Sequence, residues 1–201
     1  MSHITAPTAI SSSTDHPNPA RSLRPWWRWL LTALAFPPAG YIAHVVAGRV
    51  DSVPAAVLNG VIAGAGIGAA QWALLRHRNI SPTWIGATAL GLGAGLAAGA
   101  AFVSYRTDIA SLALMGAVSG IGVGIAQGAI LDTAKRTLGW TATSAALFAL
   151  GWTVTTAAGI DVSQQWAVFG AFGCTTLAFL QSVIVGAFVP SPSVTSEKVT
   201  S

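Results

Sequence analysis

Long runs of apolar residues, separated by short polar clusters, cover most of the chain. Six of them reach the ~20 residues that a helix needs to cross a bilayer core: Trp27–Gly48, Pro54–Leu75, Trp84–Val103, Ile109–Leu131, Trp140–Gly159 and Gln165–Val189. The runs lack the polar stripe of a helix on a soluble protein, and they are too long and too uniformly apolar for barrel strands. The pattern predicts an all-α, polytopic integral membrane protein with six transmembrane helices.

The two ends of the chain have a different character. Residues 1–25 and 190–201 are rich in Ser, Thr and Pro, which predicts disordered tails around a transmembrane domain at 26–189. Within the first run, Pro37 and Pro38 remove two amide donors and predict a kink. The first run is too long for a typical signal-peptide core, so we expect it to remain as a helix of the mature protein.

Composition and charge support a membrane protein and suggest its orientation. Hydrophobic residues make up 53% of the chain and charged residues 8%, against about 25% in a soluble domain. In a six-span arrangement, eight basic residues fall on one side: Arg21, Arg24, Arg28, Arg76, Arg78, Lys135, Arg136 and Lys198. By the positive-inside rule, both tails are expected in the cytoplasm and the protein in the cell (inner or plasma) membrane. The lipid bilayer is the expected partner of this basic chain, and no nucleic acid is expected.

An internal repeat links the second run to the fourth. A shift of 56 residues places Gly60, Gly64 and Gly68 on Gly116, Gly120 and Gly124, and the same shift places Gln71 on Gln127. The sixth run carries the same spacing, because Gly170 precedes Gln181 by the interval that separates Gly60 from Gln71. Each even run therefore joins a glycine to a later glutamine.

The odd runs repeat as well. Trp29, Trp84 and Trp140 precede Gly40, Gly95 and Gly151 at one constant interval. Together the two patterns predict three tandem helical hairpins, at about 26–76, 82–133 and 138–189. Each hairpin contains two spans and so enters the membrane in the same direction, which predicts a pseudo-threefold axis along the membrane normal.

The repeated glycines are candidates for helix packing. Small residues at helical spacing let two backbones approach closely in lipid, and Gly60, Gly64 and Gly68 share one helix face, as do Gly116, Gly120 and Gly124. Packing is the favoured interpretation of these faces, and a glycine-lined conduit is the alternative.

The three glutamines Gln71, Gln127 and Gln181 are the sharpest functional candidates. A primary amide inside a span needs partners, and the three copies could bond one another or the nearby tryptophans. We therefore weigh a polar ring that glues helices together, which is favoured, against a ligand or ion site. The tryptophans themselves match an interfacial aromatic belt.

Ionisable residues are few. Asp51, Asp108 and Asp161 each precede an even run, which predicts N-caps, or a cation-attracting ring at the outer mouth as the alternative. We expect Arg49 and Arg106 to pair with these aspartates. His44 is a candidate gate inside the first run, although it is close enough to Arg49 to reach the outer interface instead.

The sequence offers no catalytic set. The runs hold no carboxylate pair and no glutamate, and Cys174 is the only cysteine, so we expect no enzyme activity, no cofactor and no metal site. Two functions remain. The first is a small-solute conduit or ligand-binding membrane protein, with the glutamine ring as its polar constriction. The second is a structural or assembly subunit whose glycine faces pack with another copy or with a membrane partner.

Overall fold

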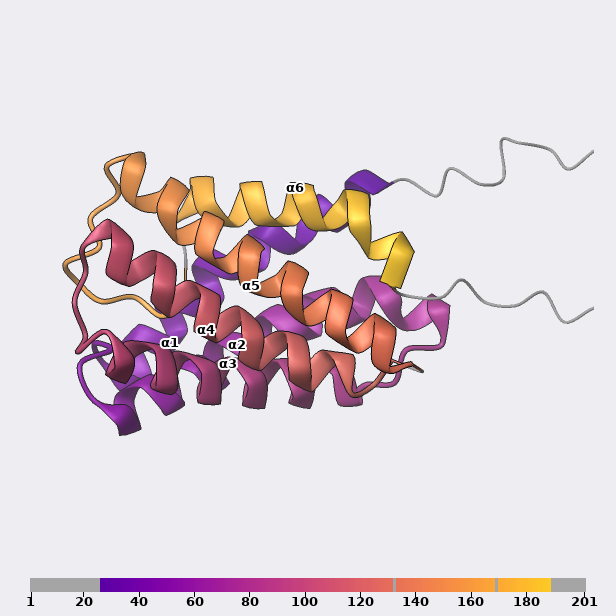
Figure 1. The fold of residues 1–201 in the computed structure, drawn as a ribbon, viewed down its shortest axis with the longest axis horizontal. Helices are drawn as coiled ribbons and strands as arrows, with labels where there is room; N and C mark the ends of the chain where they lie inside the picture. The colour runs from indigo at the N-terminus through magenta and orange to yellow at the C-terminus, as the bar shows by residue number, and fades with distance from the viewer. Residues whose placement is uncertain (1–25, 132, 169, 189–201) are drawn as a thin grey trace, which may run out of the picture.

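The computed structural model describes residues 26–131, 133–168 and 170–188, and every regular element in them is a helix (Figure 1). In chain order the elements are the 3₁₀ helix η2 (Trp26–Ala35), α1 (Phe36–Ala47), α2 (Val53–Leu75), the short 3₁₀ turn η3 (Arg76–Arg78), α3 (Thr83–Phe102), α4 (Ile109–Gly128), α5 (Ala134–Ala157) and α6 (Ala171–Phe188). The tails predicted at 1–25 and 190–201 lie outside the described residues.

The helices run along the long axis of the molecule, and the connecting segments gather at its two ends (Figure 1). Arg28, η3 and the start of α5 lie at the same end, together with the first and last described residues. We call this the basic end, because Arg76, Arg78, Lys135 and Arg136 belong to it. The segments 48–52, 103–108 and 158–168 form the opposite end, which we call the outer end.

In the part of the chain that the structure describes, four helices are long and apolar enough to cross a membrane. They are Arg28–Ala47, Val53–Arg78, Thr83–Phe102 and Ile109–Gly128, and Phe172–Val185 is a shorter apolar helix. Large apolar side chains such as Leu34, Leu90 and Phe102 are exposed on the outside of the bundle, where a bilayer would cover them. The length and apolarity of these helices and the exposed apolar side chains indicate a membrane protein.

The first apolar run changes helix type at its prolines. The 3₁₀ helix η2 ends at Ala35, and α1 begins with Pro37 and Pro38 in its first turn. Proline is tolerated there because the first amides of an α-helix have no partner within the helix. The helix type therefore changes from 3₁₀ to α at this point, and the kink expected from the two prolines stays a prediction.

Neighbouring helices approach through their glycines. A Cβ atom added to Gly60 would lie 2.6 Å from both the Gly93 Cα and the Leu92 carbonyl oxygen of α3. A Cβ atom on Gly124 would lie 2.5 Å from the Thr141 Cα of α5. Since backbone atoms fill these positions, the glycine faces of α2 and α4 are used inside the chain.

The sixth predicted span is wrong at its start. Helix α6 begins at Ala171, whereas Gln165 lies in the preceding connection, where its φ of 52° is left-handed. The connection turns back toward the bundle after Gly159 and buries Ala167 and Val168 among the helices. Its apolar residues resemble the start of a span, yet they pack as non-helical chain inside the protein.

Candidate functional site

Three buried tryptophans donate hydrogen bonds to the three repeated glutamines. The Nε1–H groups of Trp84, Trp140 and Trp29 donate to the side-chain oxygens of Gln71, Gln127 and Gln181, over 3.1, 2.9 and 3.3 Å respectively. The first pair joins α2 to α3, the second joins α4 to α5, and the third joins α6 to η2. The last pair therefore connects the end of the described chain to its beginning.

Two of the three glutamines also contact each other. The Gln127 amide nitrogen donates to the Gln71 side-chain oxygen at 3.0 Å and to the Thr88 hydroxyl at 2.8 Å. The Thr88 hydroxyl in turn donates to the Trp84 carbonyl oxygen at 2.7 Å. These bonds join Gln71, Gln127 and α3 in one network. We call this network, together with the Trp29–Gln181 pair, the tryptophan–glutamine layer.

The layer lies inside the bundle and not at its surface. Trp84 and Trp140 have no exposed area, and Trp29 and all three glutamines are buried. The aromatic-belt interpretation of these tryptophans is therefore wrong. Their ring nitrogens find amide oxygens in the interior, because a buried indole N–H needs an acceptor.

Apolar side chains close the layer on the side of the basic end. Leu75, Leu131 and Val185 are buried there in one cluster with the three tryptophans. The Phe188 ring packs edge-on against Trp140 at a centroid distance of 5.7 Å, and the Trp84 ring is 6.1 Å from Trp140. The glutamines thus face protein groups, and their geometry is that of helix-joining contacts.

The interior toward the outer end is also packed. One cavity beside Phe36, Phe148 and Trp152 and another beside Tyr105 and Met115 each measure only about 10 Å³, roughly the room of a single water molecule. Neither cavity reaches a layer glutamine. The conduit hypothesis expected the glutamines to line an axial cavity, and in these parts of the described interior the space is filled.

His44 lies where α1 meets the connection before α6. Its ring stacks at 34° on the indole of Trp166, with 4.3 Å between centroids, and its Nδ1 atom is buried without a hydrogen-bond partner. The stack holds the returning segment against α1, so His44 is a contact of the outer end and is remote from the glutamines.

The three outer aspartates behave differently from one another. Asp108 caps α4: its carboxylate accepts from the Ser111 backbone N–H at 3.0 Å and from the Ser111 hydroxyl at 2.6 Å. These bonds, the hydroxyl first, hold the pKa of Asp108 below its usual value, and Arg106 at 3.9 Å adds a smaller effect. The cap predicted at Asp108 is confirmed.

The caps predicted at Asp51 and Asp161 are wrong. Ser52 occupies the cap position of α2 and makes no side-chain cap bond, while Asp161 lies well before α6. Hydrogen bonds from Ser163 lower the pKa of Asp161 and keep the carboxylate ionised. The expected pairing of Arg49 with an aspartate is also not seen, because Arg49 donates to the Ser163 carbonyl and to Gln165.

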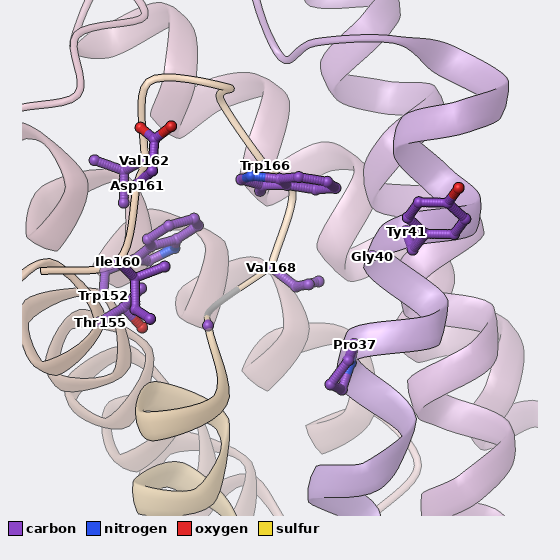
Figure 2. Close-up of a pocket in the computed structure, with 11 residues that line it drawn as sticks. Pro37, Gly40, Tyr41, Trp152, Thr155, Ile160, Asp161, Val162, Trp166 and Val168 are labelled. Carbon is purple, nitrogen blue, oxygen red and sulfur yellow. The ribbon is translucent and has the colours of Figure 1, made fainter. Parts of the chain in front are cut away.

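A larger pocket opens beside α1 at the outer half of the bundle. It has a volume of about 430 Å³ and lies between α1, α5 and the connection before α6. Figure 2 shows Pro37, Gly40 and Tyr41 on one side, Trp152, Thr155 and Ile160 on the other, and Trp166 between them. Among the described residues of the lining, Asp161 is the only charged one.

Sequence reasoning missed this pocket. The helix lengths show how the pocket arises. Helix α2 begins eighteen residues before Gln71 and α4 eighteen before Gln127, but α6 begins only ten before Gln181. Without those two turns of helix, α1 and α5 are separated at this level, and the returning segment fills the gap only in part. The adjacent polar residues Gln164 and Gln165 are the signal that could have indicated a break.

No group of three or more His, Cys, Asp or Glu side chains that could hold a metal ion occurs among the described residues. Cys174, the lone cysteine, is buried in α6. Comparison of the chain with protein-family models, with curated proteins and with solved structures finds no match. The chemistry of the chain therefore has to be inferred from its own residues.

Proposed function

We propose that the chain is a non-enzymatic, six-span protein of the cell membrane that binds an apolar small molecule through the pocket beside α1. The observation that carries this proposal is the contrast between the side pocket of about 430 Å³ and the interior cavities of about 10 Å³. Pockets of about 300–1,000 Å³ with mostly apolar walls are typical of small-ligand sites.

The six-span arrangement requires that α5 also crosses the bilayer, although it is less apolar than the other long helices. Its threonines carry much of its polarity, and they donate to carbonyl oxygens one turn earlier: Thr141, Thr153, Thr155 and Thr156, over 2.8–2.9 Å. A hydroxyl satisfied by its own helix is tolerated in hydrocarbon. At 24 residues the helix is also long enough to cross.

Three tandem hairpins account for the recurrence of the tryptophan–glutamine pair. Each pair joins the second helix of one proposed hairpin to the first helix of the next, and Trp29–Gln181 joins the third hairpin to the first. A closed ring of three hairpins would make these contacts. The layer then serves to fasten the helices, and ligand binding is left to the pocket.

The alternative function, an assembly subunit that docks through its glycine faces, is less well supported. In the described structure Gly60, Gly64 and Gly68 of α2 lie against α3, and Gly116, Gly120 and Gly124 of α4 lie against α5. Faces already covered by the same chain are not free to pack against another copy or a membrane partner.

The test uses the purified chain in liposomes with adamantyl diazirine, a small apolar photoreactive probe. We expect labelling, located by mass spectrometry, at the segment 152–168, and loss of that labelling in Ile160→Trp, where the larger ring fills the pocket. Leu150→Trp is the matched control, because Leu150 is exposed on the outside of α5. Labelling of the segment that Ile160→Trp leaves unchanged would overturn the proposal.

A flux measurement on the same liposomes distinguishes the ligand-binding proposal from the conduit hypothesis. We expect glycerol and urea to cross no faster than in protein-free liposomes, because the tryptophan–glutamine layer is packed. A flux that disappears when Gln71, Gln127 and Gln181 are all replaced by leucine would instead make the layer a constriction of a conduit.

A further inference from the structure

The pocket beside α1 has a feature that a purely hydrocarbon site would not need. Asp161 is one of the residues that line its outer end, and among the described residues no arginine or lysine lies within ion-pair distance of the Asp161 carboxylate. Asp161 is exposed and accepts from the Ser163 backbone N–H at 2.9 Å. A fixed negative charge therefore lies at the outer end of an otherwise apolar cavity.

Three aromatic residues contribute to the same lining. Trp152 comes from α5, Trp166 from the returning segment and Tyr41 from α1, so they approach the cavity from different elements (Figure 2). Aromatic faces attract cations, most strongly a substituted ammonium group that has given up its water. Aromatic rings together with one carboxylate form the chemical environment that proteins use for such cations.

We propose that this pocket binds an amphiphile with a substituted ammonium head and an apolar chain, with the head beside Asp161 and the aromatic rings and the chain among the apolar walls. The inference rests on the proposed function, because it names the ligand class of that same pocket. An anionic head is disfavoured at this position, since it would be placed next to the Asp161 carboxylate without a neutralising partner in the lining.

The apolar walls account for the other half of the ligand. Pro37 and Gly40 of α1 line one side of the cavity and Ile160 lines the other, and the Val168 side chain packs close to Gly40. A hydrocarbon chain in this space would leave either lipid or water for apolar side chains. Chain length should therefore raise affinity until the cavity is full, by about fourfold for each methylene taken out of water.

The experiment compares three probes of equal chain length on the full chain in an uncharged maltoside detergent: hexyltrimethylammonium, hexanol and hexylsulfonate. Binding is followed by isothermal titration calorimetry. We expect the cation to bind about tenfold more tightly than hexanol, from the combined cation–π and charge contributions, and the sulfonate to bind more weakly than hexanol.

Variants then assign the preference to the pocket. Asp161→Asn, an isosteric change of an exposed side chain, should reduce cation affinity about threefold and leave hexanol affinity unchanged. Asp51→Asn, at the same end of the molecule but outside the lining, should change neither. Equal affinities of the cation and hexanol for the native chain, or an Asp161→Asn variant that binds the cation as tightly as the native chain does, would overturn the inference.

The two proposals fail in distinguishable ways. If hexanol binds in a manner blocked by Ile160→Trp while the cation has no advantage, the pocket is an apolar site and only the ammonium inference is lost. If none of the three probes binds the native chain, both proposals are lost. Competition by hexylphosphocholine identifies the source: strong competition indicates a choline lipid headgroup, and weak competition indicates a free lipophilic amine.

Discussion

At the scale of single residues, the tryptophan–glutamine layer follows from donor and acceptor counts. Indole offers one N–H donor and no acceptor, whereas a primary amide offers a carbonyl oxygen and two N–H donors. Each glutamine can therefore satisfy a tryptophan and still donate elsewhere, as Gln127 does toward Gln71 and Thr88. In a membrane interior, where water cannot replace a missing partner, the pair is a better unit than either side chain alone.

The strength of one pair can be measured by a double-mutant cycle on Trp140 and Gln127. Trp140→Phe leaves the Gln127 side-chain oxygen without its donor at 2.9 Å, and Gln127→Leu leaves the indole without its acceptor. We expect the double variant to be less destabilised than the sum of the single variants, with a coupling of about 0.6–2 kcal/mol. Reversible unfolding in mixed micelles gives the free energies.

A second cycle serves as the control for the first. Trp166→Phe lies at the outer end, far from the layer, and should show no coupling to Gln127→Leu. A Trp140–Gln127 coupling no larger than this control value would mean that the hydrogen bond contributes nothing and that the pair is held by packing alone.

At the scale of helices, close approach depends on which side chains are absent. The α2 backbone meets α3 at Gly60, where even a methyl group would collide with main-chain atoms of Leu92 and Gly93. A neighbouring backbone cannot rotate away as a flexible side chain can. Helix contacts of this kind are therefore sensitive to the smallest substitution, although alanine is the better helix former.

We expect Gly60→Ala to lower the free energy of unfolding by about 1–3 kcal/mol, as overpacking does in well-packed interiors. Gly86→Ala is the matched control. It also lies within a helix, α3, but no atom lies within 4 Å of the position that its Cβ would take, so we expect no loss and up to about 1 kcal/mol of gain. The two variants are compared by unfolding in the same micelles.

Equal effects of Gly60→Ala and Gly86→Ala would show that the α2–α3 contact can expand without cost. The glycine faces would then owe their pattern to something other than tight packing within the chain.

How far the sequence predicts these elements depends on what hydropathy records. The long apolar runs locate most of the helices, because a segment with no polar stripe needs an apolar surrounding on all sides. The interval between Gln71 and Gln127 also identifies residues that meet in space, at 3.0 Å. Bonding of the amides to tryptophan was one of two alternatives that the spacing allowed, and the structure contains both.

The predictions that were wrong also have physical reasons. Trp84 and Trp140 lie close to basic clusters in the sequence, as interfacial residues do, and hydropathy does not tell which face of a helix turns inward. Ala167 and Val168 are apolar residues buried in a non-helical segment, and such a segment has the same composition as the start of a span. The side pocket accompanies the late start of α6, and the adjacent Gln164 and Gln165 are the residue-type signal that could have indicated this break.

At the scale of the whole molecule, the decisive question is how many times the chain crosses the bilayer. Four described helices meet the requirements of length and apolarity, and the crossing of α5 and α6 is part of the proposal. The two possibilities place the segment before α6 on opposite sides of the membrane. With four crossings this segment would be on the same side of the membrane as the basic end. With six crossings it would be on the same side of the membrane as the segment 103–108.

Cysteine labelling distinguishes these arrangements. In a Cys174→Ser background, single cysteines are introduced by Asn79→Cys, Ser104→Cys and Gln164→Cys, all at exposed positions outside the helices. Intact bacterial spheroplasts are then treated with a membrane-impermeant maleimide. We expect Ser104→Cys and Gln164→Cys to react at once and Asn79→Cys only after permeabilisation, because Arg76 and Arg78 retain their segment in the cytoplasm. If Gln164→Cys, like Asn79→Cys, reacted only after permeabilisation, the chain would cross the membrane four times. A reversed pattern at all three positions would keep six crossings and invert the orientation, which would move Asp161 and the opening of the pocket to the cytoplasmic side.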